Sequence, residues 1–217
     1  MQRKLLESQR GGYCFEHNTL LWQVLQQLGF QVSGLAARVR WNVPENVTTP
    51  IGHMLMQVEV DEATYIVDAG FGGITLTAPL LLHSNQAQLT THERFRLQPE
   101  QGHYTLQVEL HGGWRSLYTF ELTRFIQPDY SVWNWFTCTA PESIFIANLM
   151  AARPDASGRH ALRNNQYTYH SLDGTSHTQA LHSAQALYEC LTQQFQLQLP
   201  VSATLMNKLS MLTGPSS

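Results

Sequence analysis

The sequence is poor in charge, in cysteine and in long apolar runs. Only 13% of its 217 residues are charged, and the formal net charge is -3 at pH 7. Nucleic acids and anionic lipids bind basic surfaces, and this composition has no basic excess. No apolar run approaches the roughly 20 residues that a membrane-spanning helix needs. We therefore expect a globular protein with neither a nucleic-acid nor a membrane partner.

Cysteine occurs three times, as Cys14, Cys138 and Cys190, at uneven spacing and without a CxxC pair. Structural zinc sites and disulfide frameworks use regularly spaced or paired cysteines. The opening residues MQRKLLESQR also lack the apolar centre of a secretory signal peptide. We therefore expect no metal site and a location in the reducing cytoplasm.

The order of periodic patterns predicts an α+β fold. Residues Phe15–Leu28 carry apolar side chains at helical spacing, and Gly29 follows where helices commonly end. Short alternating runs from Leu35 onward, separated by turn residues, predict an antiparallel sheet or barrel. After Pro141 the pattern is mixed, with a polar turn at ARPDASGR, a strand-like NNQYTYHSL and a helix-like AQALYECLTQQF.

Cys14 is the first candidate for chemistry, because it follows two glycines at the predicted start of a helix. A helix N-terminus favours the thiolate, which is the nucleophilic form of cysteine, and the glycines leave the sulfur approachable. The alternative is a small buried apolar residue, since free cysteines are commonly buried.

A nucleophilic cysteine needs a base and a group that orients the base. If residues 61–62 form a tight turn, antiparallel pairing puts His53 opposite Gly70 and places Asp68 on the same face, one diagonal step away. A longer turn would shift this register. His17, one helical turn after Cys14, is a rival base without an identified carboxylate, and a lone histidine at a strand start is commonly a surface residue.

The glycine-rich segment DAGFGG at 68–73 does not predict a phosphate-binding loop. Such loops open a helix, whereas this segment is followed by ITLTAPLLL, which is β-branched and contains proline. The glycines instead favour a tight bend where another backbone or a ligand approaches closely.

Three segments resemble the signature segments of the arylamine N-acetyltransferases, in order and at matching separations: RGGYCFEHNTLL at 10–21, HMLMQV at 53–58 and IVDAGFGG at 66–73. TAPESIF at 139–145 and WRSLYTFEL at 114–122 are also similar to that family. The resemblance implies three lobes: a partial helical lobe at 1–33 that carries the cysteine, a β-barrel lobe at 34–135 that carries His and Asp, and an α/β lid at 136–217.

The resemblance also implies a reaction. Cys14 matches the acetylated nucleophile, His53 its base and Asp68 the orienting carboxylate. The expected activity is ping-pong acetyl transfer from acetyl-CoA to the nitrogen of arylamines, arylhydroxylamines or hydrazines, as in xenobiotic metabolism. Acetyl-CoA would be a cosubstrate, and no permanently bound cofactor is expected.

Further site residues follow from the same resemblance, each with an alternative interpretation as an ordinary loop or core residue. Thr49 and Ser143 match positions for CoA contacts, and Gly52 and Phe136 match positions in the acceptor pocket. Gly72 and neighbouring backbone N–H groups are candidates to line the site.

The sequence departs from the family pattern ahead of Arg10. The resemblance implies an upstream helical segment with an acidic partner for this arginine, whereas only MQRKLLESQ precedes it. We therefore expect an N-terminally short first lobe, exposure of Leu5, Leu6 and Trp22, self-association through this helical face, and reduced activity and stability. A transglutaminase-like thiol hydrolase and an inactive truncated remnant are the alternative functions.

Overall fold

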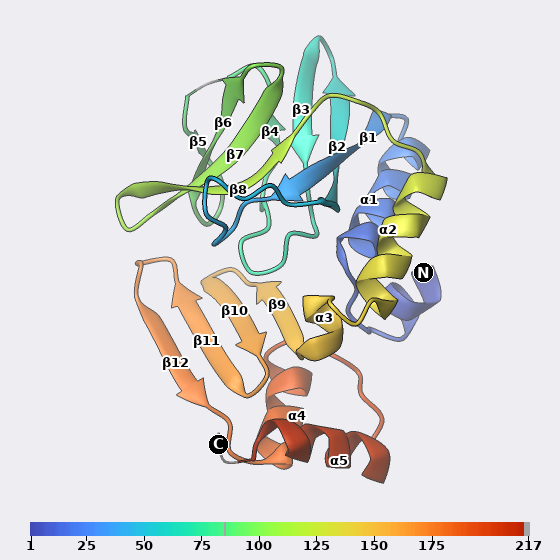
Figure 1. Ribbon diagram of the computed structural model, residues 1–217, viewed down its shortest axis with the longest axis vertical. Helices are drawn as coiled ribbons and strands as arrows, with labels where there is room; N and C mark the ends of the chain where they lie inside the picture. Colours follow the sequence, from blue (N-terminus) through green and yellow to red (C-terminus); the bar gives the residue numbers. More distant parts are fainter. Residues whose placement is uncertain (85, 215–217) are drawn as a thin grey trace. The chain divides into compact units, whose positions relative to one another are not determined.

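The computed structural model describes residues 1–84 and 86–214, and it combines helices with two antiparallel sheets (Figure 1). The predicted α+β class is confirmed. The helical elements are η1 (Arg3–Glu7), α1 (Cys14–Gln27), α2 (Gln127–Thr139), α3 (Ile144–Ala147), α4 (Ala184–Gln193) and α5 (Ala203–Leu212). The strands are β1 (Gln31–Val39), β2 (Ile51–Val60), β3 (Ala63–Val67), β4 (Leu80–Leu81), β5 (Gln88–Leu89), β6 (Arg94–Glu100), β7 (His103–Leu110), β8 (Gly113–Phe120), β9 (Met150–Pro154), β10 (Gly158–Arg163), β11 (Gln166–Ser171) and β12 (Ser176–Ala180).

The chain divides into two compact units. Tyr13–Cys138 forms one, called here the barrel unit, and Met1–Gly12 together with Thr139–Ser217 forms the other, called here the second unit. The division into three lobes stays a prediction. Its second boundary, between residues 135 and 136, falls inside α2.

The barrel unit contains the larger of the two sheets, which forms a nearly closed antiparallel barrel. Its eight strands run in the order β4-β3-β2-β1-β8-β7-β6-β5. The two edge strands β4 and β5 are joined by a side chain: the Gln88 amide accepts from the Leu81 N–H at 2.7 Å and donates to the Leu81 carbonyl at 3.0 Å. This amide satisfies backbone groups that an open edge would leave unpaired.

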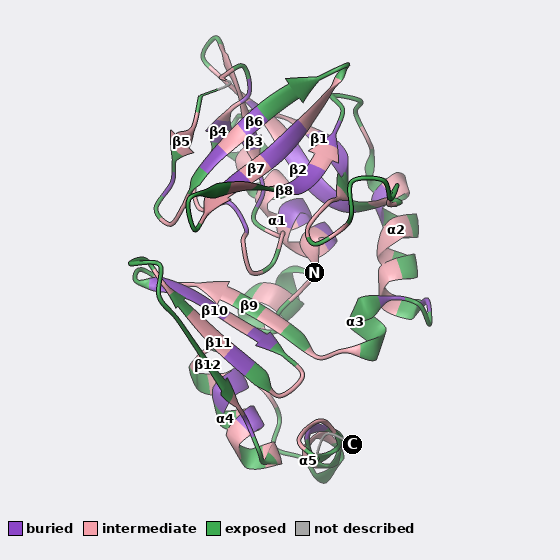
Figure 2. Cartoon of the chain, turned by 60° about the vertical axis from the view of Figure 1, so that its left-hand side comes forward, coloured by how far each residue is buried: buried purple, intermediate pink, exposed green. Residues whose placement is uncertain are grey.

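Alternating apolar residues of these strands fill the barrel core, and Figure 2 shows the buried stretches of β2 and β7. Removing this apolar surface from water is the main stabilisation of the sheet. The largest members of the core, each fully buried, are Leu35, Leu55, Ile66, Leu80, Leu82, Phe95, Leu97, Leu106 and Tyr118.

Helix α1 begins and ends close to the predicted positions. Tyr13 is its N-cap residue, and the Glu16 carboxylate accepts from the Tyr13 N–H at 3.2 Å. Gly29 follows the helix with φ of 92°, a conformation that favours glycine. The buried face of the helix consists of Phe15, Asn18 and Thr19.

Helix α2 is not predicted by the sequence pattern, because its residues are mostly aromatic or β-branched and favour helices weakly. Its Tyr130 is fully buried, donates from its hydroxyl to the Leu35 carbonyl at 3.0 Å, and packs its ring against Phe15 and Trp22. The expected exposure of Trp22 is therefore wrong, since this side chain is half-buried.

Two further exposure predictions fall in the second unit. Leu5 is half-buried, against expectation, whereas Leu6 is 61% exposed, as expected.

The second unit contains a four-stranded sheet in the order β12-β11-β10-β9, which packs with α4 and α5 around a separate apolar core. Ser202 caps α5 by accepting from the Leu205 N–H, and the sequence pattern does not predict this last helix either.

The predicted polar turn joins β9 to β10. The Asp155 carboxylate accepts from the N–H groups of Ser157 and Gly158, each at 2.8 Å. Its other oxygen lies 2.8 Å from Nε2 of the buried His160, whose Nδ1 lies 2.7 Å from the Tyr167 hydroxyl. Both ring nitrogens of His160 are thus occupied within the second unit.

Candidate active site

The β2–β3 hairpin has the register predicted from the sequence. Val60 pairs with Ala63 across a turn at Asp61 and Glu62, and the ladder continues to Met56 and Val67. It ends there, so Asp68 lies in the loop after β3. His53 lies on β2 and pairs on its other side with Ala37 of β1.

This hairpin brings His53 and Asp68 into contact. The imidazole Nε2 lies 2.7 Å from Oδ2 of the carboxylate, and the two side chains are 4% and 0% exposed. At such burial a carboxylate is stable as an anion only with several hydrogen-bond donors.

Asp68 has four donors. Oδ2 accepts from His53 and from the Tyr118 hydroxyl at 3.0 Å, and Oδ1 accepts from Asn18 at 2.9 Å and from the Gly70 N–H at 2.8 Å. Burial alone raises the pKa of Asp68, but the charge of His53 and these hydrogen bonds outweigh it and lower that pKa. Burial and the neighbouring Asp68 charge raise the pKa of Tyr118, which keeps its hydroxyl a donor.

Asn18 is a site residue that the sequence reasoning does not identify. Its Nδ2 also donates to the Met54 carbonyl at 2.6 Å, and its Oδ1 accepts from the Ala69 N–H at 2.8 Å. The side chain therefore joins α1 to β2 and to the Asp68 loop. Asn18 follows Cys14 by four residues, so both lie on one face of the helix. This spacing is the sequence feature that could have identified Asn18 as a site residue.

Cys14 is the first residue of α1, and its interaction with the imidazole contributes to the raised pKa of His53. Burial alone lowers the pKa of His53, but the charges of Asp68 and Cys14 and the hydrogen bonds to both raise it to about 10. The raised pKa favours a charged imidazolium at His53. His53, and not the rival His17, carries the bond to Asp68.

Close packing against Cys14 explains the glycine at position 70. A Cβ atom at this position would lie 2.6 Å from Cα and 3.0 Å from Cβ of Cys14. Any larger residue would push the loop away from the start of α1. Glycine is required here by close approach.

Aromatic rings surround the imidazole. The Phe71 ring meets His53 edge-on, with centroids 5.1 Å apart, and the Tyr118 ring lies at 4.9 Å. Such surroundings exclude water and strengthen the charged hydrogen bonds of the site.

The loop between β1 and β2 is held by arginines. Arg40 donates to the backbone carbonyls of Val47, Pro44 and Glu45. Arg38 donates to the Thr49 carbonyl at 2.7 Å, and the Thr49 hydroxyl donates to the Val39 carbonyl at 2.8 Å. Thr49 is thereby fixed four residues before His53.

The other predicted contact residues lie in different environments. Gly52 is exposed and precedes His53 on β2, and the space beside it is open, because no atom lies within 4 Å of the position that a Cβ would take. Phe136 is 51% exposed on α2, and Gly72 is exposed with φ of 84°. Ser143 is buried at the N-cap of α3 and belongs to the second unit, so the two residues predicted to contact CoA fall in separate units. Their roles stay predictions.

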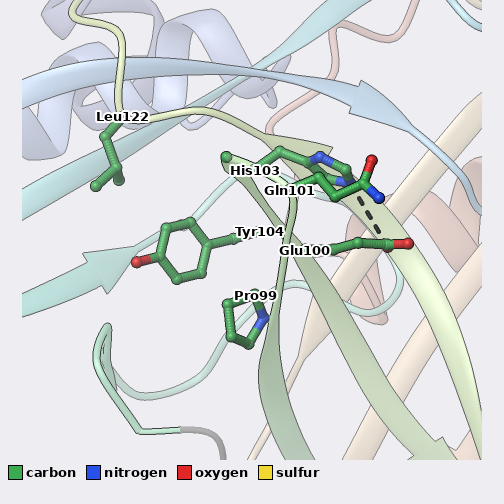
Figure 3. Close-up of a pocket in the computed structure, with 7 residues that line it drawn as sticks. Pro99, Glu100, Gln101, His103, Tyr104 and Leu122 are labelled. Carbon is green, nitrogen blue, oxygen red and sulfur yellow. Dashed lines mark ion pairs between the residues drawn. The ribbon is translucent and has the colours of Figure 1, made fainter.

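Two surface hollows lie away from these residues. One of about 420 Å³ surrounds the β6–β7 turn and is lined by Pro99, Tyr104 and Leu122, with an ion pair of 3.7 Å between Glu100 and His103 (Figure 3). Another of about 470 Å³ lies between residues 29–31 and 59–61. Neither contains a predicted site residue.

Within residues 1–84 and 86–214, no group of three or more His, Cys, Asp or Glu side chains is arranged to hold a metal ion. Over the same described residues, no helix has the length and apolar character needed to cross a membrane.

Comparison with known proteins defines the class. A family model described as N-acetyltransferase matches residues 1–204. A chain with this match, this barrel, a half-buried cysteine and a buried imidazole and carboxylate falls among the acyltransferases.

Individual relatives define the family. The arylamine N-acetyltransferase of Mycolicibacterium smegmatis is 38% identical over 187 residues, which are 85% of this chain and 68% of the relative. That of Escherichia coli K12 is 37% identical over 198 residues, 90% of this chain and 70% of the relative. The structure of Mycobacterium marinum arylamine N-acetyltransferase in complex with CoA superposes with a TM-score of 0.93 at 33% identity, covering 97% of this chain and 80% of that one. The chain belongs to the arylamine N-acetyltransferase family.

Proposed function

We propose that this protein transfers the acetyl group of acetyl-CoA to the nitrogen of arylamines, arylhydroxylamines or hydrazines through an acetyl-Cys14 intermediate. The observation that carries the proposal is the buried His53–Asp68 pair, whose imidazole also interacts with the half-buried Cys14. Family membership supplies the reaction class, and the CoA complex of the M. marinum relative supports acetyl-CoA as cosubstrate.

In the first half-reaction the Cys14 thiolate attacks the carbonyl carbon of the acetyl thioester. The bond between that carbon and the CoA sulfur then breaks, and CoA leaves with the proton of the His53 imidazolium. A thioester is already activated, so the leaving thiolate needs no strong acid. Backbone N–H groups near Gly72 are candidates to stabilise the oxyanion.

In the second half-reaction the acceptor nitrogen attacks the acetyl carbon on Cys14. Neutral His53 takes the proton of that nitrogen, and the Cys14 thiolate leaves as its bond to the acetyl group breaks. Asp68 holds the imidazole in one orientation and stabilises its charged form in both halves of the cycle.

Substrate contacts belong to the same proposal. Thr49 and Ser143 would contact CoA, and Gly52 and Phe136 would line the acceptor pocket. Acetyl-CoA would bind only as a cosubstrate.

A cytoplasmic location, a role in xenobiotic metabolism and self-association through a helical face stay predictions. The exposed apolar residues Val24 of α1 and Leu28, the C-cap of this helix, offer a surface for such association.

Initial-rate kinetics with acetyl-CoA and an arylamine such as aniline test the mechanism. We expect parallel double-reciprocal lines, because CoA leaves before the acceptor reacts. Intersecting lines would contradict the acetyl-enzyme. Cleavage of a peptide amide without any use of acetyl-CoA would instead support the thiol hydrolase, and no turnover of either substrate would support the inactive remnant.

A further inference from the structure

The segment from Asp68 to Thr75, called here the Asp68–Thr75 loop, carries three parts of the candidate site. Asp68 meets His53, Gly70 lies against the start of α1, and Phe71 packs edge-on against the His53 ring. Glycines at positions 70, 72 and 73 give the loop wide backbone freedom. Because the backbone of this loop is not stiff, side-chain interactions have to hold Phe71 in place.

The Thr75 side chain closes this loop. Its hydroxyl accepts from the Phe71 N–H at 3.2 Å and donates to the Asp68 carbonyl at 3.1 Å. The Thr75 N–H donates to the Gly72 carbonyl at 3.2 Å. Thr75 is buried, so water cannot readily replace these bonds.

We propose that Thr75 is a positioning residue for acetyl transfer, acting through Phe71 on the second half-reaction. This inference rests on the proposed function. The acceptor nitrogen has to come within hydrogen-bond reach of His53 to lose its proton. The ring that borders His53 therefore borders the acceptor, and its placement affects acceptor binding.

The two ends of the loop differ in how much they depend on Thr75. The Asp68 carboxylate keeps its bonds to Asn18, Tyr118 and His53 when the hydroxyl is removed. The Phe71 N–H, in contrast, loses the Thr75 hydroxyl as its acceptor. Loss of the hydroxyl should therefore disturb the acceptor side and spare the acetylation of Cys14.

Thr75→Val removes the hydroxyl and nearly preserves side-chain volume, and Thr75→Ser keeps the hydroxyl. Thr90→Val is the matched control, because Thr90 is equally buried at 7% exposure and its hydroxyl donates to the Glu93 carbonyl and accepts from the His92 N–H. Both valine variants lose a buried hydroxyl of the barrel unit. The Thr75 hydroxyl bonds to Asp68 and Phe71 within the loop, whereas the bonds of the Thr90 hydroxyl are to residues outside it.

The two half-reactions are measured separately, by single-turnover acetylation with acetyl-CoA and by the KM for aniline. For Thr75→Val we expect an acceptor KM raised about tenfold, the size of one unsatisfied buried donor, with Cys14 acetylation within about twofold of the parent. Thr75→Ser should restore the KM, and Thr90→Val should leave both measurements unchanged. Thr75→Ala replaces the valine variant if the latter does not fold.

The double variant of Thr75→Val and Phe71→Ala tests whether Thr75 acts on the acceptor through Phe71. If Thr75 acts through Phe71, its substitution should have little further effect on the acceptor KM in that background. Equal effects of the Thr75 and Thr90 variants, equal losses in both half-reactions, or additivity with Phe71→Ala would overturn the inference. Failure of the parent to acetylate Cys14 would contradict the proposed function itself.

Discussion

The barrel unit and the second unit each bury a histidine against an aspartate, at nearly equal distance. Nε2 of His53 lies 2.7 Å from Asp68, and Nε2 of His160 lies 2.8 Å from Asp155. The pairs differ in the further partner of the imidazole. The pKa of His53 is raised in part by Cys14, whereas Nδ1 of His160 lies 2.7 Å from the hydroxyl of Tyr167.

The two carboxylates also differ. The Asp68 side chain is fully buried and receives donors from α1, β2 and β8, whereas that of Asp155 is 26% exposed and accepts mainly within its own turn. Burial raises the pKa of Asp155, but hydrogen bonds from Ser157, His160 and Gly158 outweigh it and lower that pKa. A His–Asp pair thus stabilises a turn in one unit, and in the other it interacts with Cys14, the proposed nucleophile.

The largest expected effect comes from removing the proposed nucleophile. Cys14→Ala should lower acetyl transfer at least about 10³-fold, because no thiol remains to accept the acetyl group. Cys190→Ala is the control from the second unit, where burial raises the pKa of the Cys190 thiol to about 11. Cys138→Ala is a control within the barrel unit. Steady-state rates test all three, and equal losses would contradict the assignment.

Exchanging each carboxylate for an amide sharpens the comparison. Asp68→Asn should lower kcat/KM by roughly 10³ to 10⁴, because the amide stabilises neither the imidazole orientation nor its charged form. Asp155→Asn should leave the rate within about twofold and lower only the Tm, through weakened bonds in its turn. Steady-state rates and thermal unfolding of both variants test these two expectations. Similar rate losses in the two variants, or no loss for Asp68→Asn, would contradict the assignment of Asp68 to catalysis and of Asp155 to turn stability.

Gly70→Ala tests the close approach that joins the pair to its nucleophile. The added methyl meets the start of α1, and we expect overpacking of about 1–3 kcal/mol in the free energy of unfolding, with slower alkylation of Cys14 by iodoacetamide. Gly113→Ala is the control, since its added Cβ has its nearest neighbour at an ordinary 3.9 Å. A Gly70 variant as stable and as reactive as the Gly113 variant would disprove the contact.

The smallest effect concerns pH. The pKa of His53 is raised from 6.5 to about 10, so the folded chain holds this proton more tightly than the unfolded chain. The stabilisation is complete below about pH 6.5 and is lost as the pH rises through about 10. The free-energy difference between the parent and His53→Gln should therefore shrink with rising pH when both are unfolded with urea. A difference that stays constant or grows would contradict the raised pKa.

The sequence allows prediction of those parts of the site that depend on local pattern. The helix at Cys14 follows from apolar spacing and from Gly29, and the meeting of His53 with Asp68 follows from hairpin register across a two-residue turn. Both rest on contacts between residues close in the chain. Local periodicity is sufficient to predict such contacts.

The remaining parts depend on contacts between distant segments. Tyr118 reaches Asp68 only because β8 pairs with β1, and β1 with β2. Tyr130 on α2 is buried by long-range packing that overrides the weak helix propensity of its neighbours. Because no local signal encodes such pairings, the sequence alone predicts neither residue.

The central claim is that Cys14 carries the acetyl group between the two substrates. Its most direct test is incubation with acetyl-CoA, followed by intact mass measurement and peptide mapping before and after addition of aniline. We predict a gain of one acetyl group, located on Cys14, that disappears when aniline is added. Formation of acetylated aniline without any acetyl group on Cys14, or a stable acetyl group on another residue only, would contradict this account.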